Sequence, residues 1–274
     1  MTVRIRSMLR FVLLTIAALL AVGPVLWTVS TSFKTQVETQ TYPPTVVPNE
    51  GTLANYARLF TDPQFLSASL TSVGVALVAT LLVLAVTFPC AYALVRLRPH
   101  GRRSLILLVM LAQTVPSIVF VIPLYSMALE VGLYDTRLLL MLVYAGFLVP
   151  FTTILLASFV RGLPEEVEEA ARVDGAGYLR MLLLIVLPMM RGGMASAAIF
   201  TGFYAWNEFL IPVILGGEQA RPLTVYVASF VTQKTIEWGP LTAAVTLVLL
   251  PVVVVVLTLQ RHLVAGLTAG ATKG

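Results

Sequence analysis

Charged residues and cysteine are the scarcest components of this chain, and their scarcity limits what it can be. Only 11% of the 274 residues carry a charge, whereas a soluble domain carries about 25%. Hydrophobic residues make up 58% and the mean hydropathy is +0.91, so we expect lipid to surround most of the apolar surface. The one cysteine, Cys90, excludes an internal disulfide and lies in an apolar run, where a small buried side chain is the expected role.

Lysine and histidine are also few, which argues against enzyme chemistry. None of the lysines (Lys34, Lys234 and Lys273) follows a glycine, so the sequence has no phosphate-binding loop of the G-x-x-x-x-G-K-S/T type. The histidines His100 and His262 lie at the ends of apolar runs, and the sequence shows neither a nucleophile–base pair nor a cluster of metal ligands. The net charge of +5 does not predict nucleic-acid binding, because the basic residues are spread over separate loops. We therefore expect a non-catalytic chain without a cofactor.

Long apolar runs are what the chain has in abundance. A helix that crosses a bilayer needs about 20 apolar residues. The first run follows three arginines, as in a signal peptide, but it is long for one and no small-x-small cleavage site follows it. We therefore predict an all-α membrane protein with six transmembrane helices, at about residues 11–30, 70–95, 104–126, 138–160, 193–215 and 241–262.

The basic residues predict the orientation of these helices. With six crossings, thirteen of the eighteen Lys and Arg residues fall on the side that holds both termini and the loops 96–103 and 161–192. Cytoplasmic loops carry such an excess, so we predict that both termini and these loops are cytoplasmic. The long connection at about 31–68 then lies outside, and a loop of this length is commonly functional.

Residues 165–188, EEVEEAARVDGAGYLRMLLLIVLP, are the one strongly charged and strongly patterned segment. Pro164 and the glutamates suit the first turn of a helix, whose dipole favours acidic groups there. Asp174-Gly175 predicts the end of that helix, because glycine adopts left-handed geometry without strain. A second, apolar helix follows and is predicted to stop near Pro188, so we expect a helix–turn–helix that contacts a cytoplasmic partner.

The spacing Glu169-Ala170-Ala171, Gly175, Ile185, Leu187 and Pro188 resembles the EAA loop of permeases of ABC importers. The resemblance covers nearly the whole chain and is greatest to the carbohydrate-uptake branch, in its maltose G-type family. It rests further on Ser32-Phe33-Lys34, Asn55-Tyr56, Ala91-Tyr92-Ala93, Ile122-Pro123-Leu124-Tyr125, Gly132-Leu133, Trp206-Asn207-Glu208-Phe209 and Gly266-Leu267-Thr268-Ala269-Gly270.

The resemblance implies a type I ABC importer permease fold with both termini inside, in the plasma (inner) membrane of a bacterium or archaeon. It implies a cytoplasmic ABC ATPase dimer that holds ATP and Mg²⁺, a second permease subunit and an external substrate-binding protein as partners. It also implies that the loop is a coupling helix that fits a cleft of the ATPase. We expect Glu165, Glu169 and Ala170 on or near one face, with Leu163, Val167, Ala170 and Ala171 as an apolar patch. The predicted coupling residues are Glu165, Glu169, Ala170, Ala171, Asp174, Gly175 and Pro188.

Glu208 is the one acidic residue inside a predicted span, and an ionisable group at membrane depth is a functional-site hypothesis. Trp206-Asn207-Glu208 joins an aromatic ring, an amide and a carboxylate, a set that suits sugars, and Tyr204 lies four residues before Glu208. The alternative is that the rings belong to the interfacial belt and that Glu208 points outward or caps a neighbouring helix. Gln113 and Tyr125, in the third span, are further candidates for the pathway.

One alternative function stays open at this point. An ion-coupled secondary transporter usually shows several intramembrane acids or broken helices, and one glutamate supports it weakly.

The chain itself is expected to comprise a first helix and outer loop (1–67), a permease core (68–265) and a cytoplasmic tail (266–274).

Overall fold

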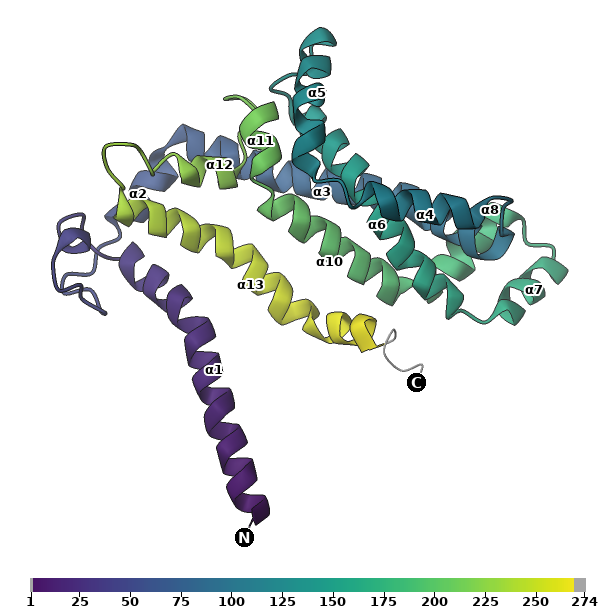
Figure 1. Cartoon of the computed structure of the whole chain (residues 1–274), viewed down its shortest axis with the longest axis horizontal. Coiled ribbons are helices and arrows are strands. Elements are labelled where there is room, and N and C mark those ends of the chain that lie inside the picture. The colour runs from purple at the N-terminus through teal and green to yellow at the C-terminus, as the bar shows by residue number, and fades with distance from the viewer. Residues whose placement is uncertain (1, 269–274) are drawn as a thin grey trace. The chain divides into compact units, whose positions relative to one another are not determined.

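The computed structural model describes residues 2–268, with side chains described from 7 to 258. Over this range the chain is almost entirely helical, and one isolated β-bridge joins Val231 to Ile236. Figure 1 shows the helices, which are α1 (Thr2–Ser32), η1 (Glu38–Gln40), α2 (Ala54–Thr61), α3 (Pro63–Tyr92), η2 (Ala93–Leu97), α4 (Arg102–Ala112), α5 (Ser117–Glu130), α6 (Arg137–Arg161), α7 (Glu165–Val173), α8 (Tyr178–Met181), η3 (Leu182–Val186), α9 (Leu187–Met189), α10 (Arg191–Asn207), α11 (Leu210–Leu215), α12 (Leu223–Ala228) and α13 (Trp238–Thr268).

Four helical stretches of the described chain are long and apolar enough to cross a membrane: Ser7–Ser32, Pro63–Leu97, Arg137–Arg161 and Trp238–Thr258. Two further pairs of helices are long and apolar enough only when the two helices of each pair are counted as one span. Arg102–Ala112 with Ser117–Glu130 is bent by 88°, and Tyr178–Met189 with Arg191–Asn207 is bent by 79°. Counted as one span each, the bent pairs bring the number of spans to the predicted six, although the second pair begins and ends earlier than the predicted 193–215, and the all-α membrane fold is confirmed.

The predicted span 193–215 is wrong as a single helix. α10 ends at Asn207, Glu208 is extended with φ −64° and ψ 130°, and α11 starts at Leu210. Pro212 explains the interruption, because a proline ring conflicts with the carbonyl four residues earlier, here that of Glu208. The apolar run continues across the break, so hydropathy alone does not reveal it.

The chain divides into two compact units. One is made of residues up to Leu66 together with Tyr226–Pro251, and the other of Ser67–Val225 together with the residues from Val252 onward. In the first unit, Asn55 Nδ2 donates to the carbonyls of Ser32 and Lys34, both at 2.9 Å, and so fixes the start of α2 against the end of α1. Two side-chain pairs add to this unit: Arg58–Glu237 at 2.5 Å and Tyr226–Asp62 at 2.6 Å.

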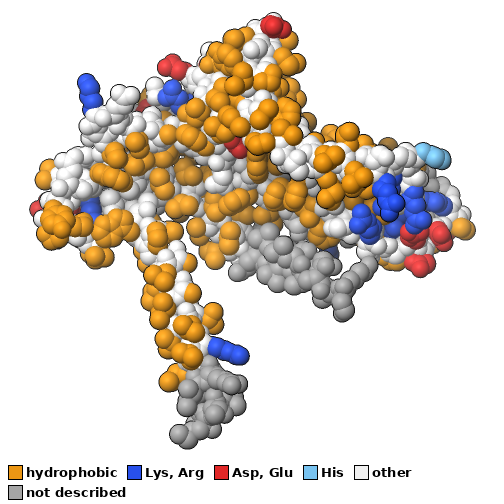
Figure 2. Space-filling view, viewed as in Figure 1, with side chains coloured by type: hydrophobic (Ala, Val, Ile, Leu, Met, Phe, Trp, Pro, Cys, Tyr) orange, Lys and Arg blue, Asp and Glu red, His pale blue; other side chains and the backbone are white. Residues whose placement is uncertain are grey.

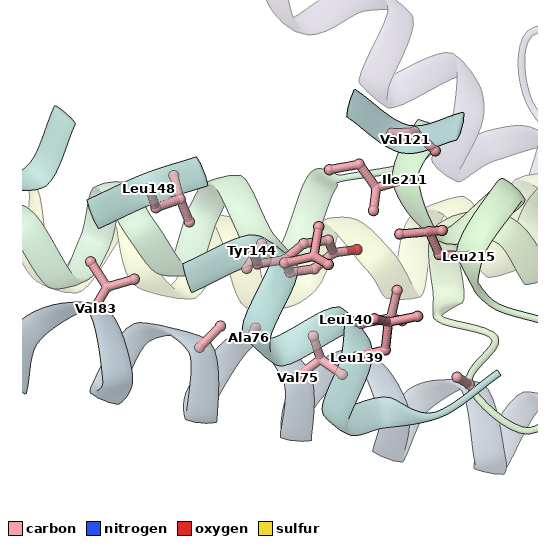
Figure 3. Packing of buried hydrophobic residues seen from close by; sticks show 14 of the residues in the cluster. Val75, Ala76, Val83, Val121, Leu139, Leu140, Tyr144, Leu148, Ile211 and Leu215 are labelled. Carbon is pink, nitrogen blue, oxygen red and sulfur yellow. The ribbon is translucent and has the colours of Figure 1, made fainter. Parts of the chain in front are cut away.

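The second unit is built around α6. Figure 3 shows its larger core, where α3, α5, α6 and α11 meet around the buried Tyr144. Val75, Ala76 and Val83 come from α3, Val121 from α5, Leu139, Leu140 and Leu148 from α6, and Ile211 and Leu215 from α11. A second core joins the end of α3, η2, α6 and the segment from α7 to α10.

A glycine brings α10 close to α6 in this unit. A Cβ on Gly193 would lie 2.7 Å from Cγ of Phe159, a distance that real Cβ atoms do not show. Seven residues further along α10, Phe200 stacks on Phe151 of α6, with ring centroids 4.4 Å apart. The two helices therefore touch along their length, and α6 positions both the start of α7 and the end of α10.

Candidate functional site

The charged loop folds as the sequence predicts, as a short helix, a turn and a second helix. Pro164, with φ −65° and ψ 128°, precedes α7 by one position, and three glutamates occupy the first turn. Asp174 ends the helix and Gly175 takes φ +78°, the left-handed geometry expected of it. The second helix runs through α8, η3 and α9, contains Pro188 and stops at Met189.

α7 has two faces of different character. Glu168 and Ala171 are buried against the rest of the chain. Glu166, Glu169 and Val173 point the other way with Ala170, since residues three and four apart share a helix face, and all four are exposed. Val173 is 88% exposed, which is a large fraction for an apolar side chain at the end of a helix.

The buried face of α7 is held by Arg96 of η2. Arg96 Nε donates to Glu168 Oε1 at 2.8 Å, Nη1 to Glu165 Oε1 at 3.0 Å and Nη2 to the carbonyl of Leu163 at 2.8 Å. Tyr92 donates its hydroxyl to the other Glu168 oxygen at 2.6 Å. The side chains of Arg96 and Glu168 are only 7% and 4% exposed, so the ion pair lies inside the protein.

Two predicted coupling residues therefore contact their own chain. Glu165, 57% exposed, pairs with Arg96 and lies 4.0 Å from Arg98, and Ala171 packs in the second core. The predicted apolar patch is accordingly wrong for Ala171 and for the half-buried Leu163, which joins the same core. The cause is that Glu168 and Ala171 share a helix face that Arg96 and the end of α3 cover.

Sequence reasoning did not assign Arg96, Tyr92 or Glu168 to the site. Arg96 and Glu168 lie 72 residues apart, and no spacing rule connects them. One signal was available in the sequence. Four glutamates fall in five successive positions at the start of the nine-residue helix α7, so they cannot all share its outward face. At least one of them had to face the rest of the protein and needed a cation there. Figure 2 shows where these charges gather, with Lys and Arg side chains beside Asp and Glu at one end of the second unit.

Glu208 acts as a helix cap. Its Oε1 accepts from the backbone amides of Leu210 and Ile211 at 3.0 and 3.1 Å, and its carbonyl accepts from the Thr224 hydroxyl at 2.8 Å. Asn207 donates to the carbonyl of Phe203 at 2.8 Å. Helix capping was one of the alternatives that the sequence left open for Glu208, and the structure shows this cap. Glu208 therefore lies at the break between α10 and α11.

The other pathway candidates lie in the same unit. Tyr204 and Trp206 pack against the larger core from α10, and the electrostatic contacts of Tyr204 include Glu208. Tyr125 stacks edge-on against Tyr134 with centroids 5.3 Å apart. Gln113 ends α4 at the bend before α5, where its Nε2 reaches the Phe147 carbonyl at 3.4 Å. Gln113 and Glu208 therefore each mark a break in a predicted span.

A further polar centre escaped the sequence analysis. Asp135, a non-glycine residue with φ +56°, accepts from the backbone amides of Gly217 at 2.7 Å, Gln219 at 3.1 Å and Ala220 at 2.8 Å. It ties the turn before α6 to the loop after α11. Within residues 7–258, no group of three or more His, Cys, Asp or Glu side chains is placed to hold a metal ion.

Comparisons with known proteins give a consistent result. The profile of the family described as "Binding-protein-dependent transport system inner membrane component" matches residues 85–269. The chain is 36% identical to the diacetylchitobiose uptake system permease protein NgcG of Streptomyces coelicolor, over 95% of this chain and 87% of that protein. It is 34% identical to the trehalose transport system permease protein SugB of Mycobacterium tuberculosis, over 93% of each.

A solved structure shares the fold. It is a chain of a bacterial ABC transporter involved in the import of the acidic polysaccharide alginate, with a TM-score of 0.82 at 24% identity, over 94% of this chain and 96% of that one. A second solved structure, of a bacterial alginate ABC transporter in complex with an alginate pentasaccharide-bound periplasmic protein, gives a TM-score of 0.69 at 17% identity, over 93% of each chain. The predicted fold is thereby confirmed.

Proposed function

Because this chain belongs to the family of inner membrane components of binding-protein-dependent transport systems, we propose that it is the transmembrane permease subunit of an ATP-driven importer. It forms part of the translocation pathway and hydrolyses nothing itself. The sequence has no phosphate-binding loop, so ATP and Mg²⁺ are held by a separate cytoplasmic ATPase dimer. The remaining partners are a second permease subunit and an external substrate-binding protein. The chain itself lies in the inner membrane of a bacterium, with both of its termini in the cytoplasm.

The proposed substrate is a carbohydrate or a sugar derivative. Two relatives that align over almost the whole chain are named for diacetylchitobiose and trehalose, and a third, from Agrobacterium fabrum, is named for sulfoquinovosyl glycerol. The proposed pathway residues are Gln113, Tyr125, Tyr204, Trp206, Asn207 and Glu208. Their support is chemical, because rings, amides and a carboxylate suit the C–H faces and hydroxyls of sugars.

The outward face of α7 is the proposed contact with the ATPase. The observation that carries this assignment is Val173, which is 88% exposed beside Glu166 and Glu169 on a helix whose other face is fixed to its own chain. Within the described residues neither glutamate forms an ion pair or side-chain hydrogen bond. Covering an exposed apolar side chain with a partner removes its surface from water, which favours binding. Ala170 allows close approach, and Asp174, Gly175 and Pro188 set the turn and the following helix.

A mild-detergent pull-down of the tagged chain from its native host tests the proposal. We expect an ATPase with a phosphate-binding loop and a second permease to co-purify. Val173→Arg is expected to lower ATPase recovery about tenfold, because it places an unpaired charge in the proposed contact, while recovery of the second permease stays unchanged. Val47→Arg is the matched control, since Val47 is an apolar residue 71% exposed in the connection between α1 and α2.

The purified assembly is then reconstituted in vesicles with its binding protein and offered radiolabelled trehalose and diacetylchitobiose. Uptake that requires ATP supports the importer. A chain that purifies alone, is indifferent to Val173→Arg and moves solute on an ion gradient would establish the secondary transporter instead.

A further inference from the structure

Arg96 binds three separate acceptors with its three nitrogens. Nε contacts Glu168, Nη1 contacts Glu165, and Nη2 contacts the carbonyl of Leu163 just before α7. Both oxygens of Glu168 are used, one by Arg96 and one by the fully buried Tyr92. A planar guanidinium presents its donors in a rigid fork, so this arrangement fixes both the position and the rotation of α7.

α7 has little other lateral attachment. Its buried side chains are those of Glu168 and Ala171, and one alanine methyl group contributes little apolar area. A buried ion cannot leave its partner without becoming unpaired, which is strongly unfavourable. The Arg96–Glu168 pair therefore holds α7 and the end of α3 at a fixed separation and does not let them slide past each other.

The end of α3 is in turn rigidly connected to the interior of the second unit. Arg96 lies in η2, a π-helical turn of the kind that occurs often at functional sites. Ala91, Tyr92 and Val95 pack in the second core, and further along the same helix Val75 and Val83 pack in the larger one. A displacement of Arg96 thus acts directly on both cores.

We propose that Arg96, with Glu168 and Tyr92, is a positioning residue that makes α7 and α3 move as one body. When a partner displaces α7 through its outward face, the buried ion pair carries the motion into α3, in parallel with the covalent path through α6. The four glutamates divide this work: Glu165 and Glu168 bind Arg96, and Glu166 and Glu169 face the partner. This inference rests on the proposed function, because it requires an ATPase that moves α7.

The test measures the distance between α7 and α3 in the assembled complex, with partner cysteines replaced. Cys90, the one native cysteine, lies on α3 and is exposed, so the predicted buried role is wrong. Val167→Cys adds a second label at the edge of α7, where 39% of Val167 is exposed. Pulsed EPR between spin labels at these positions is recorded without nucleotide and after trapping with MgATP and vanadate.

With Arg96 intact, we expect the distance to stay the same in both states. In Arg96→Lys, one ammonium cannot serve three acceptors in this geometry, so we expect nucleotide to change the distance by about 2 Å or more, the scale of helix shifts in allosteric proteins. Import of the probe sugar per ATP hydrolysed is expected to fall about tenfold, the size associated with losing a charge-assisted hydrogen bond. Arg98→Lys is the control, because Arg98 is 71% exposed and only approaches Glu165, at 4.0 Å.

An Arg96→Lys complex with an unchanged distance and normal import per ATP would overturn the proposal. Equal losses in Arg98→Lys would overturn it as well, since the effect would then belong to any nearby positive charge. If Arg96→Lys does not assemble, Tyr92→Phe, which removes one hydrogen bond to Glu168, is measured in its place with the same criteria. If the chain with its native Arg96 recovers no ATPase in the pull-down, that result contradicts the proposed function, independently of the results for the Arg96 variants.

Discussion

Glu38 is the carboxylate around which the connection between α1 and α2 folds. Its Oε1 accepts from the Asn49 amide and from the Thr45 hydroxyl, both at 2.8 Å. Lys34, only 2% exposed, donates to the Thr45 carbonyl and packs over the ring of Trp27 at 4.7 Å. A single acidic side chain thus organises a segment that otherwise has one short turn of 3-10 helix, η1, as its regular structure.

The charge of Glu38 makes this segment sensitive to acid. The Asn49 amide, against the opposing effect of burial and with help from Thr45 and Lys34, holds the pKa of the Glu38 carboxyl below its ordinary value of 4.5. When the pKa of a carboxyl is lower in the folded protein than in the unfolded chain, its charge stabilises the fold at pH values above the unfolded-chain pKa. That stabilisation is lost as the pH falls through the pKa of the folded protein. We expect hydrogen exchange of residues 33–50 in lipid nanodiscs, corrected for intrinsic rates, to rise below about pH 4.5.

Glu38→Gln is expected to remove this pH dependence, because its amide does not titrate. Glu50→Gln serves as the control, since Glu50 is exposed and in the same connection. Acid-induced exchange that persists in Glu38→Gln, or disappears in Glu50→Gln, would show that another group is responsible.

At the scale of elements, the contact of α6 with α10 depends on one of two adjacent glycines. Gly193→Ala places a methyl group 2.7 Å from Cγ of Phe159, whereas nothing lies within 4 Å of a methyl group at Gly192. We expect Gly193→Ala to destabilise the protein by about 1–3 kcal/mol, the cost of overpacking a filled interior. Gly192→Ala is expected to be neutral or slightly stabilising, because alanine favours helix over glycine.

Thermal unfolding of both variants in one detergent checks this expectation. A melting temperature for Gly193→Ala equal to that of Gly192→Ala would show that the two helices separate easily and are not closely packed at Gly193.

At the scale of the whole molecule, the orientation in the membrane can be tested with two single substitutions. Val47→Cys lies in the connection predicted to face outward and Val173→Cys on the predicted cytoplasmic side, and the native side chains are 71% and 88% exposed. We expect an impermeant maleimide to label Val47→Cys on intact cells and to label Val173→Cys only after permeabilisation, with Cys90→Ala as the common background. The reverse pattern would invert the predicted topology.

Much of the fold could be predicted because its signals are local. Apolar runs located five spans and part of the remaining one. Pro164, Asp174-Gly175 and Pro188 located the ends of the loop helices to within a residue or two. The break at Glu208 could not be read from hydropathy, because the proline responsible lies four residues further on in an unbroken apolar run. Residues 269–274 of the predicted tail lie outside the described part of the chain.

The site was predicted only where its residues are neighbours in sequence. Helical spacing put Glu169 and Ala170 on an exposed face, and α7 has that face. It gave no information on which glutamates meet Arg96, or on the amides that Asp135 binds more than 80 residues away. Such pairs arise from tertiary packing, which a single sequence does not display.

Because α7 has one buried and one exposed face, its rotation about its own axis is fixed by the number of residues that precede it. Each residue of an α-helix advances the chain by about 100° around the axis, so one inserted residue between Pro164 and Glu166 would rotate Glu168 away from Arg96 and carry Val173 toward the interior. Nine residues, with both ends anchored, leave no room to absorb that rotation. The segment beyond Gly175 has its own constraint, because Met181, Leu182 and Val186 are buried in the second core. Relatives of this chain are therefore expected to keep the residue count from the end of α6 to Pro188.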